Sequence, residues 1–267
     1  MSFFEWFIGL RYIKAKEKRA FISLITLISI GGVALGVMIL ITVLAVMNGF
    51  EKDLRNKILG TMSHITIFKQ GEDNFKEYRE IMTRISKTPH IVSSTPFIFA
   101  QAMLQSTSGS MEGVIVRGVN PIQEASVTEI KKNIIEGNLS LNEKEIVIGK
   151  ELANKMGVRI GDTLLVISKV VQTPMGLMPR STEFKVAGIF ETGMYEYDIS
   201  LIYISLDMAQ KLYGFGNGVS GIEIKLDDIF YAEKIAVLLQ KELAYPSWAR
   251  SWSDMNRNLF SALKLDK

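Results

Sequence analysis

The longest apolar stretch of the chain lies near its start. Residues 21–47 contain no charged side chain, and a helix of this length extends about 40 Å at 1.5 Å per residue, enough to cross the hydrocarbon core of a bilayer. A secretory signal peptide is the alternative interpretation, but its apolar region has only about 7 to 15 residues and ends at a small-residue cleavage site. The sequence has no such site here, and we therefore predict a transmembrane helix over residues 21–48.

Charges on the two sides of this helix differ. The preceding segment has one acidic residue, Glu17, among five basic ones: Arg11, Lys14, Lys16, Lys18 and Arg19. The segment after the helix mixes both signs: Glu51, Lys52, Asp53, Arg55 and Lys57. The positive-inside rule places the N-terminus in the cytoplasm and the rest of the chain on the other side. The first residues are also rich in aromatic side chains, so residues 1–20 are expected to form a cytoplasmic segment that lies in the membrane interface.

Two further features concern the membrane helix. Gly32 and Gly36 have the spacing that lets a second membrane helix approach closely, or they are glycines of the kind common in any membrane helix. Phe50, Leu54 and Ile58 continue the helical spacing beyond the apolar stretch. We therefore expect residues 49–60 to form a helical stalk.

Short strand and helix patterns alternate through the remaining chain. Alternating or β-branched runs predict strands at residues 64–68, 97–105, 114–119, 145–148, 164–169, 183–190, 201–204 and 221–226. Helical spacing predicts helices at residues 78–87, 150–156, 206–212 and 229–243, and the start of another at 251–267. The order is not a strict βαβ repeat, so the fold class is α+β, with one domain over residues 61–250.

The composition excludes most catalytic chemistry. The formal charge is +3, the chain has no cysteine, and its two histidines, His64 and His90, are far apart in the sequence. No motif of a nucleophile with its base, of a metal site or of a phosphate-binding loop occurs. We therefore expect a non-catalytic protein without cofactor or metal, and no nucleic-acid partner because no basic patch follows residue 20.

The most unusual loop lies between the predicted strands 164–169 and 183–190. Residues 170–180 contain two prolines, which we expect to exclude a regular ladder and to keep the segment stiff. Large apolar side chains occupy what should be a hairpin tip, where they either contact another protein or fold back onto their own domain. The candidate docking residues are Gln172, Thr173, Pro174, Met175, Gly176, Leu177, Met178, Pro179 and Arg180.

Three segments of the chain resemble a known family. Residues 3–67 are similar to the N-terminus of lipoprotein-releasing permeases of the LolC/LolE type. TPMGLMP (residues 173–179) is similar to the chaperone-binding hook of the LolC branch, and KELANKMGVRIGDTL (residues 150–164) resembles the wider MacB-like periplasmic domain family. The resemblance covers the whole chain and implies a two-lobed periplasmic MacB-like domain.

The resemblance also implies a function and partners. These permeases belong to ABC transporters of bacterial inner membranes, where they extract lipoproteins from the outer leaflet and pass them to a LolA-type periplasmic chaperone. A LolD-type ATPase and a second LolC/LolE-type permease subunit, identical or divergent, are implied, together with contact to membrane lipids. Such permeases have three more membrane helices, so we expect this chain to stop before them. For the acyl chains, the outer end of the helix offers one apolar stripe: Val43, Met47 and Phe50.

Two other functions remain open from the sequence. A MacB-type or FtsX-type permease would transmit the conformational changes of its ATPase to a periplasmic partner without moving lipoproteins. A signal-anchored periplasmic sensor or binding protein would need no ATPase. The apolar hook-like loop argues against the first of these, and the family resemblance argues against the second.

Overall fold

A computed structural model describes residues 7–9, 11, 20–61, 63–69, 71, 74–173, 176–243 and 245–255, with the backbone alone at 20–23, 51–61, 169–173 and 176–179. The chain divides into two units, Met1–Leu54 and Arg55–Lys267. Most of the predicted interfacial segment, residues 1–20, and of the predicted last helix, residues 251–267, lies outside the described residues.

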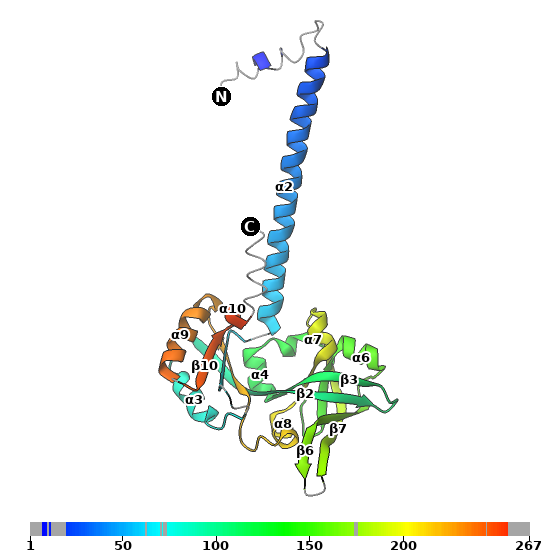
Figure 1. Cartoon of the computed structure of the whole chain (residues 1–267), viewed down its shortest axis with the longest axis vertical. Helices are drawn as coiled ribbons and strands as arrows, with labels where there is room; N and C mark the ends of the chain where they lie inside the picture. The colour runs from blue at the N-terminus through cyan, green and yellow to red at the C-terminus, as the bar shows by residue number, and fades with distance from the viewer. Residues whose placement is uncertain are drawn as a thin grey trace. The chain divides into compact units, whose positions relative to one another are not determined.

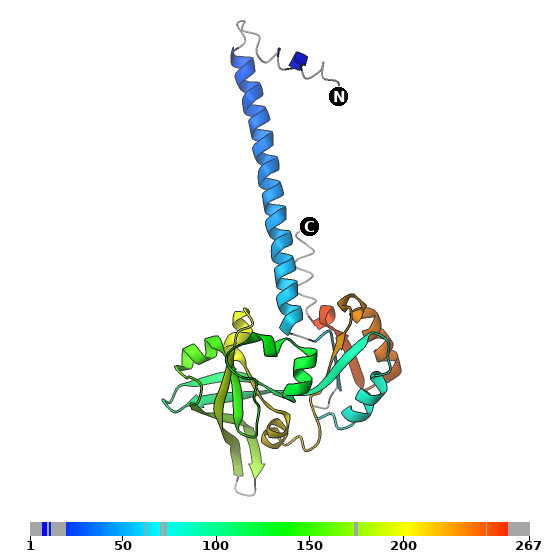
Figure 2. The same cartoon turned by 180° about the vertical axis from the view of Figure 1, so that it is seen from behind.

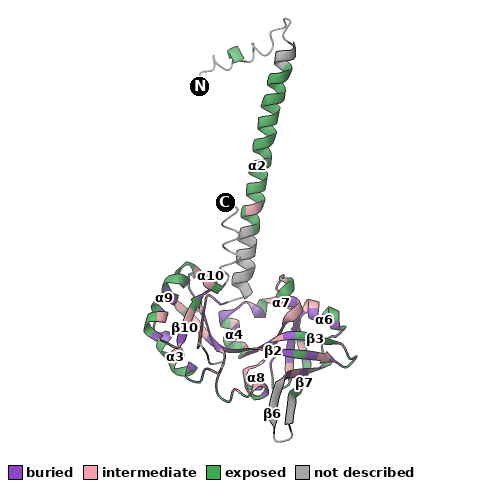
Figure 3. Ribbon diagram, in the orientation of Figure 1, coloured by how far each residue is buried: buried purple, intermediate pink, exposed green. Residues whose placement is uncertain are grey.

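Helix α2 (Ala20–Thr61) runs without interruption through 42 residues and includes the predicted stalk. Its segment Leu24–Phe50 has a mean hydropathy of 2.6, which makes it long and apolar enough to cross a membrane. Apart from the half-buried Met47, the large apolar residues of this segment are exposed (Figure 3). A helix that is apolar all round is stable in lipid or inside a protein core, but not in water.

The second unit is built on one sheet of ten strands in the order β10-β1-β9-β2-β3-β8-β5-β7-β4, with β6 paired to β2 and β7 (Figure 1). The strand β2 (Ile91–Ser106) is long enough to serve two lobes. Residues 91–97 of β2 pair with β9 (Gly221–Leu226), and residues 97–105 pair with β3 (Met111–Val119). Phe97 belongs to both ladders.

The first lobe contains β1 (Ile65–Lys69), β9, β10 (Ser247–Ser251) and the first part of β2. The helices α3 (Tyr78–Ile85) and α9 (Ala232–Leu243) contribute buried residues to its core, including Ile85, Ile235 and Leu239. The 3-10 turn η1 (Ile229–Tyr231) precedes α9, and the short helix α10 (Trp252–Met255) follows β10. The backbone N–H of Trp252 donates to the carbonyl of His64 at 3.0 Å, so the chain enters and leaves this lobe at neighbouring points.

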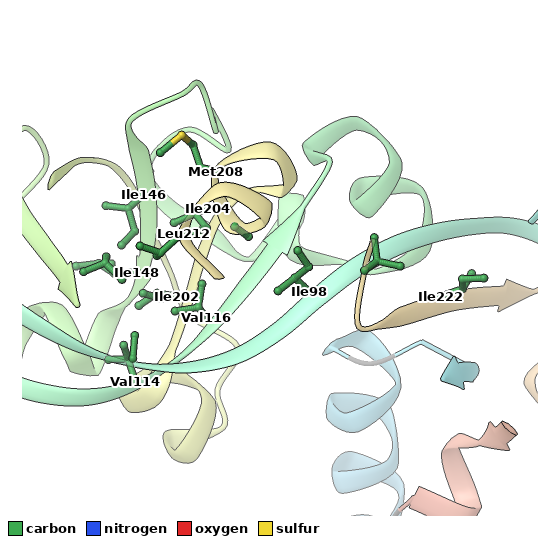
Figure 4. Packing of buried hydrophobic residues seen from close by; sticks show 14 of the residues in the cluster. Ile98, Val114, Val116, Ile146, Ile148, Ile202, Ile204, Met208, Leu212 and Ile222 are labelled. Carbon is green, nitrogen blue, oxygen red and sulfur yellow. The ribbon is translucent and has the colours of Figure 1, made fainter. Parts of the chain in front are cut away.

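The second lobe contains a closed ring of strands. Starting from β2, each strand pairs with the next and the last pairs with β2 again: β3, β8 (Leu201–Ser205), β5 (Glu145–Gly149), β7 (Gly176–Phe190) and β6 (Thr163–Thr173). Branched aliphatic side chains fill the interior, among them Val114 and Val116 of β3, Ile146 and Ile148 of β5, and Ile202 and Ile204 of β8 (Figure 4). Closure leaves no free edge in the ring and fixes where its hairpins emerge.

Helices and one strand decorate this ring. The helices are α4 (Pro121–Val127), α5 (Ile130–Asn133), α6 (Lys150–Met156), α7 (Tyr195–Ser200) and α8 (Leu206–Tyr213), and the strand β4 (Ile134–Gly137) pairs with β7. Ser205 caps α8 by accepting a hydrogen bond from Met208 N, and Gly157 ends α6 in the left-handed conformation.

One prediction about elements is wrong. We expected the prolines to end the ladder at residue 170, yet β6 and β7 stay paired up to Thr173 and Gly176. Beyond the ring each of these strands has a single partner, and a proline is compatible with an edge or a bulge because no second ladder needs its N–H group.

Candidate functional site

The β6–β7 hairpin extends beyond the ring. β2 pairs with β6 only at residues 164–167, whereas the β6–β7 ladder continues to Thr173 opposite Gly176. The extension of six residues reaches about 20 Å at 3.3 Å per residue. Figures 1 and 2 show the hairpin at the end of this unit opposite α10. A two-stranded ribbon is only marginally stable alone in water, so its base needs support.

A bulge marks the base of the hairpin. Ile167 pairs with Ser181 and Val170 with Pro179, so Ser168 and Lys169 together lie opposite Arg180. The Oγ of the buried Ser168 donates to the carbonyl of Arg180 at 3.2 Å. Such a bulge bends its strand and changes the direction of the hairpin beyond it.

The last turn of α8 supports this base. The Nη1 of Arg180 donates to the carbonyl of Lys211 at 3.1 Å, and the Oγ of Ser168 lies 3.5 Å from the carbonyl of Leu212. Carbonyls in the last turn of a helix lack partners within the helix, and a cation there also interacts favourably with the helix dipole. The base of the hairpin is therefore held by α8, which packs on the strands of the ring.

The structure describes the predicted docking residues unevenly. Gln172 pairs with Leu177 and Thr173 with Gly176, while Met178 and Pro179 pair with Val171 and Val170. Pro174 and Met175 lie outside the described residues. Arg180, the last of the candidate docking residues, lies at the base of the hairpin with its guanidinium on α8.

The predicted sites on the membrane helix share a stripe but meet no other segment among the described residues. Val43 and Phe50 are exposed and Met47 is half-buried. A Cβ atom added to Gly32 or Gly36 would meet nothing within 4 Å. Their proposed roles in acyl-chain contact and helix packing therefore remain predictions.

A buried ion cluster lies where the two lobes meet. The Nη2 of Arg117, on β3, donates to the Oε1 of Glu124, on α4, at 2.9 Å and to the Oε2 of Glu223, on β9, at 2.5 Å. These side chains are 9%, 0% and 7% exposed, in the same order. The rings of Phe97 and Tyr203 lie 5.6 and 5.7 Å from the guanidinium carbon, within the range of cation–π contacts. Within the described residues, Arg117 Nε and Glu124 Oε2 have no hydrogen-bond partner.

This cluster predicts a pH dependence. Burial raises the pKa of Glu124 from its ordinary 4.5 to about 7, against the attraction of Arg117. A raised pKa means that the folded state favours the protonated form of Glu124. The contribution of this group to the stability of the fold is therefore complete below about pH 4.5 and is lost as the pH rises through about 7. We expect Glu124→Gln, which cannot titrate, to remove this loss. Melting temperatures at pH 5 and pH 8 should therefore differ less in the variant than in the wild type, and an equal difference would contradict the assignment.

The two histidines have structural contacts around the end of β9. The Nδ1 of His64 accepts a hydrogen bond from Leu226 N at 3.1 Å, and burial lowers the pKa of this imidazole. The Nδ1 of His90 lies 3.1 Å from the Asp227 carboxylate, and its ring stacks on Tyr231 with centroids 4.2 Å apart. These contacts hold the connection between β9 and η1.

Sequence reasoning missed both the ion cluster and the support of the hairpin. Arg117 had a visible signal, because it interrupts the apolar run of its strand, and Glu223 had a weaker one in an alternating strand. Glu124 lies in a segment to which we assigned no element. The anchoring carbonyls of Lys211 and Leu212 give no sequence signal, because every residue has a carbonyl.

Comparison with known proteins agrees with the predicted resemblance. The chain is 37% identical over 264 residues to the lipoprotein-releasing system transmembrane protein LolC of Xylella fastidiosa, covering 97% of this chain and 63% of that protein. It is 35% identical to the LolC protein of Neisseria meningitidis, covering 98% of this chain and 64% of that protein. The chain thus spans less than two thirds of the length of these relatives.

The fold and the domain family agree with each other. The periplasmic region of MacB from Actinobacillus actinomycetemcomitans superposes with a TM-score of 0.51 at 15% identity, covering 76% of this chain and 94% of that one, which supports the fold alone. Residues 26–241 match the MacB-like periplasmic core domain family. The chain therefore belongs to the family of the MacB-like periplasmic core domain.

Proposed function

We propose that this chain is part of a permease subunit of an ABC transporter that releases lipoproteins from the inner membrane and hands them to a periplasmic chaperone. Similarity to LolC proteins along nearly the whole chain supports this assignment. The observation that carries it is the β6–β7 hairpin, which projects beyond the ring and ends in an apolar segment with two prolines. In this function the N-terminus is cytoplasmic and the second unit is periplasmic, in accord with the charge asymmetry around α2.

The handover needs an acceptor close to the donor. An acyl chain in a bilayer is held by about 0.8 kcal/mol per buried CH₂ group, so a lipoprotein does not leave for water at a useful rate. A LolD-type ATPase supplies the work, a second LolC/LolE-type subunit completes the permease, and a LolA-type chaperone receives the lipid. The hairpin is the contact for that chaperone, because its paired strands and prolines reduce the entropy lost on binding. Adaptable methionine side chains at the tip suit such a surface.

Changes at the tip are expected to weaken chaperone binding. In the complete chain, purified in detergent, Met175→Asp places a charge in an apolar contact and Pro174→Ala relaxes the stiff backbone. We expect each to raise the Kd for the LolA-type chaperone of the same organism at least tenfold, about 1.4 kcal/mol. Calorimetry or surface plasmon resonance measures this directly.

A matched control distinguishes the hook from a general loss of apolar surface. Met111 is an exposed methionine at the start of β3, next to the turn of a different hairpin. Met111→Asp should leave the Kd unchanged. Two results would contradict this function: no binding by the folded wild type, or equal weakening by Met111→Asp and Met175→Asp. Either would favour a permease that transmits the conformational changes of its ATPase without handing over lipoproteins.

The outer end of α2 is the proposed acyl contact. Val43, Met47 and Phe50 are three and four residues apart, so they share one helix face that lies at the end of the apolar segment. Photo-crosslinkers at these positions in the assembled transporter should label the acyl chains of a lipoprotein, whereas one at Leu35 should label phospholipid equally with and without lipoprotein. Failure of all three positions to label lipoprotein would reject the site.

A further inference from the structure

The described chain passes between the lobes at two places. The first is β2, in which Pro96 pairs with Ile222 of the first lobe and Ile98 pairs with Gly118 of the second. The second is the segment that connects α8 to β9, residues 214–220. Everything else that joins the lobes is non-covalent.

Both crossings have the features of a hinge. Proline at position 96 has no N–H group to donate, which weakens the β2–β9 ladder next to Phe97, where the pairing of β2 with β3 begins. Residues 214–220 contain three glycines, and Gly214 and Gly216 have φ angles of +72° and +58°. Segments of this kind absorb changes in backbone angles at low cost.

The Arg117 cluster spans this hinge. Arg117 lies on β3 of the second lobe and Glu223 on β9 of the first, 106 residues apart in the chain. Glu124 lies on α4, which follows β3 in the chain but packs on β2 and β9. The guanidinium of the second lobe therefore holds one carboxylate on a first-lobe strand and one on a helix packed against β2 and β9, and the rings of Phe97 and Tyr203 lie within cation–π distance of it.

We propose that the Arg117 cluster is a lock across this hinge, which makes the two lobes move as one body. A buried ion pair contributes little net stability but strongly favours the one geometry that satisfies it. Two atoms of the cluster, Arg117 Nε and Glu124 Oε2, are left without partners in the described residues, so the cost of burial is not fully compensated and the lock can open.

The lock has a consequence for motion within this unit. The chain connections at His64 and Trp252 belong to the first lobe, and the β6–β7 hairpin belongs to the second. With the cluster intact, a displacement of the backbone at His64 and Trp252 is transmitted in full to the hairpin. With the cluster broken, the hinge absorbs part of it. This inference concerns the mechanics of the domain and does not depend on the proposed function.

Glu124→Gln combined with Glu223→Ala is the variant that cuts the lock, because either carboxylate alone would still hold Arg117 to elements packed on the first lobe. Glu112→Ala is the matched control, because it also removes a glutamate from a salt bridge, here at 2.8 Å from Lys155, but both partners belong to the second lobe. Neither variant touches the hairpin or the membrane helix.

Distances between spin labels test the lock in the complete chain. The chain has no cysteine, so Val237→Cys on α9 and Glu183→Cys on β7, both exposed, give one labelled site in each lobe. We expect a single narrow distance distribution in the wild-type background and in Glu112→Ala, and one at least twice as wide in the double variant Glu124→Gln/Glu223→Ala, measured by pulsed electron paramagnetic resonance.

An unchanged distribution in the folded double variant would overturn the proposal. If that variant does not fold, Glu124→Gln combined with Glu223→Gln replaces it, because the amides keep the size of the glutamates but lose their charge, and a broader distribution is again required. The measurement involves neither chaperone nor lipoprotein. Its failure is therefore distinguishable from failure of the proposed function.

Discussion

Replacing Arg117 by methionine is expected to lower the free energy of unfolding by about 3–5 kcal/mol, because it leaves two buried carboxylates without their cation. Methionine has a similar length and fills the space beside Phe97 and Tyr203, so the effect reports charge rather than a cavity. Urea unfolding of the purified chain in detergent, followed by the fluorescence of Trp248 and Trp252, measures the change. Glu124 can become neutral in the variant, which limits the loss but does not remove it.

Lys155→Met is the matched comparison for this change. Lys155 is paired with Glu112 at 2.8 Å, but its side chain is 49% exposed. Exposed pairs of this kind contribute about 0–1 kcal/mol. Equal losses in the two variants would show that burial of the Arg117 cluster does not determine its contribution.

Gly149→Ala is expected to cost about 3 kcal/mol, at the upper end for overpacking. A Cβ atom at position 149 would lie 2.1 Å from the carbonyl oxygen of Asp198 and 2.6 Å from its carbonyl carbon. Asp198 cannot move aside, since its buried carboxylate accepts hydrogen bonds from the backbone and the hydroxyl of Thr192, both at 2.8 Å. Thermal or urea unfolding of the variant checks the prediction.

Gly113→Ala provides the comparison for Gly149→Ala. Gly113 lies within β3, and a Cβ atom there would meet nothing within 4 Å. Alanine reduces the freedom of the unfolded chain, so this change should be neutral or stabilising by up to about 1 kcal/mol. A similar loss at both positions would indicate that the close approach at Gly149 is not the cause.

Local patterns predicted the elements whose signal lies within a few residues. The apolar segment Leu24–Phe50, the β2–β3 hairpin and the helix α6 with its terminal Gly157 are all visible in the sequence because charge, alternation and end residues mark them. The strand β10 was missed, since Ser247–Ser251 contains two serines and an arginine and becomes a strand only beside β1. Its partner lies almost two hundred residues earlier in the chain.

Long-range features could not be predicted in this way. Closure of the ring depends on β6 reaching β2, a pairing between strands about sixty residues apart for which no local residue is responsible. The continued ladder of the β6–β7 hairpin depends on a bulge that accommodates Pro179, and its support depends on backbone carbonyls of α8. At the candidate site, composition identified the apolar tip, but not the contacts that hold its base.

The two neighbouring points at which the chain enters and leaves the first lobe have one more consequence. The backbone bond between Trp252 and His64, with Ile65 and Ser251 paired beside it, brings the ends of a segment of almost two hundred residues together. A fold closed in this way can be inserted into a short connection without separating the elements on either side. The segment between residues 63 and 252 is therefore suited to exchange between related proteins as one unit, with both junctions placed at the paired strands β1 and β10.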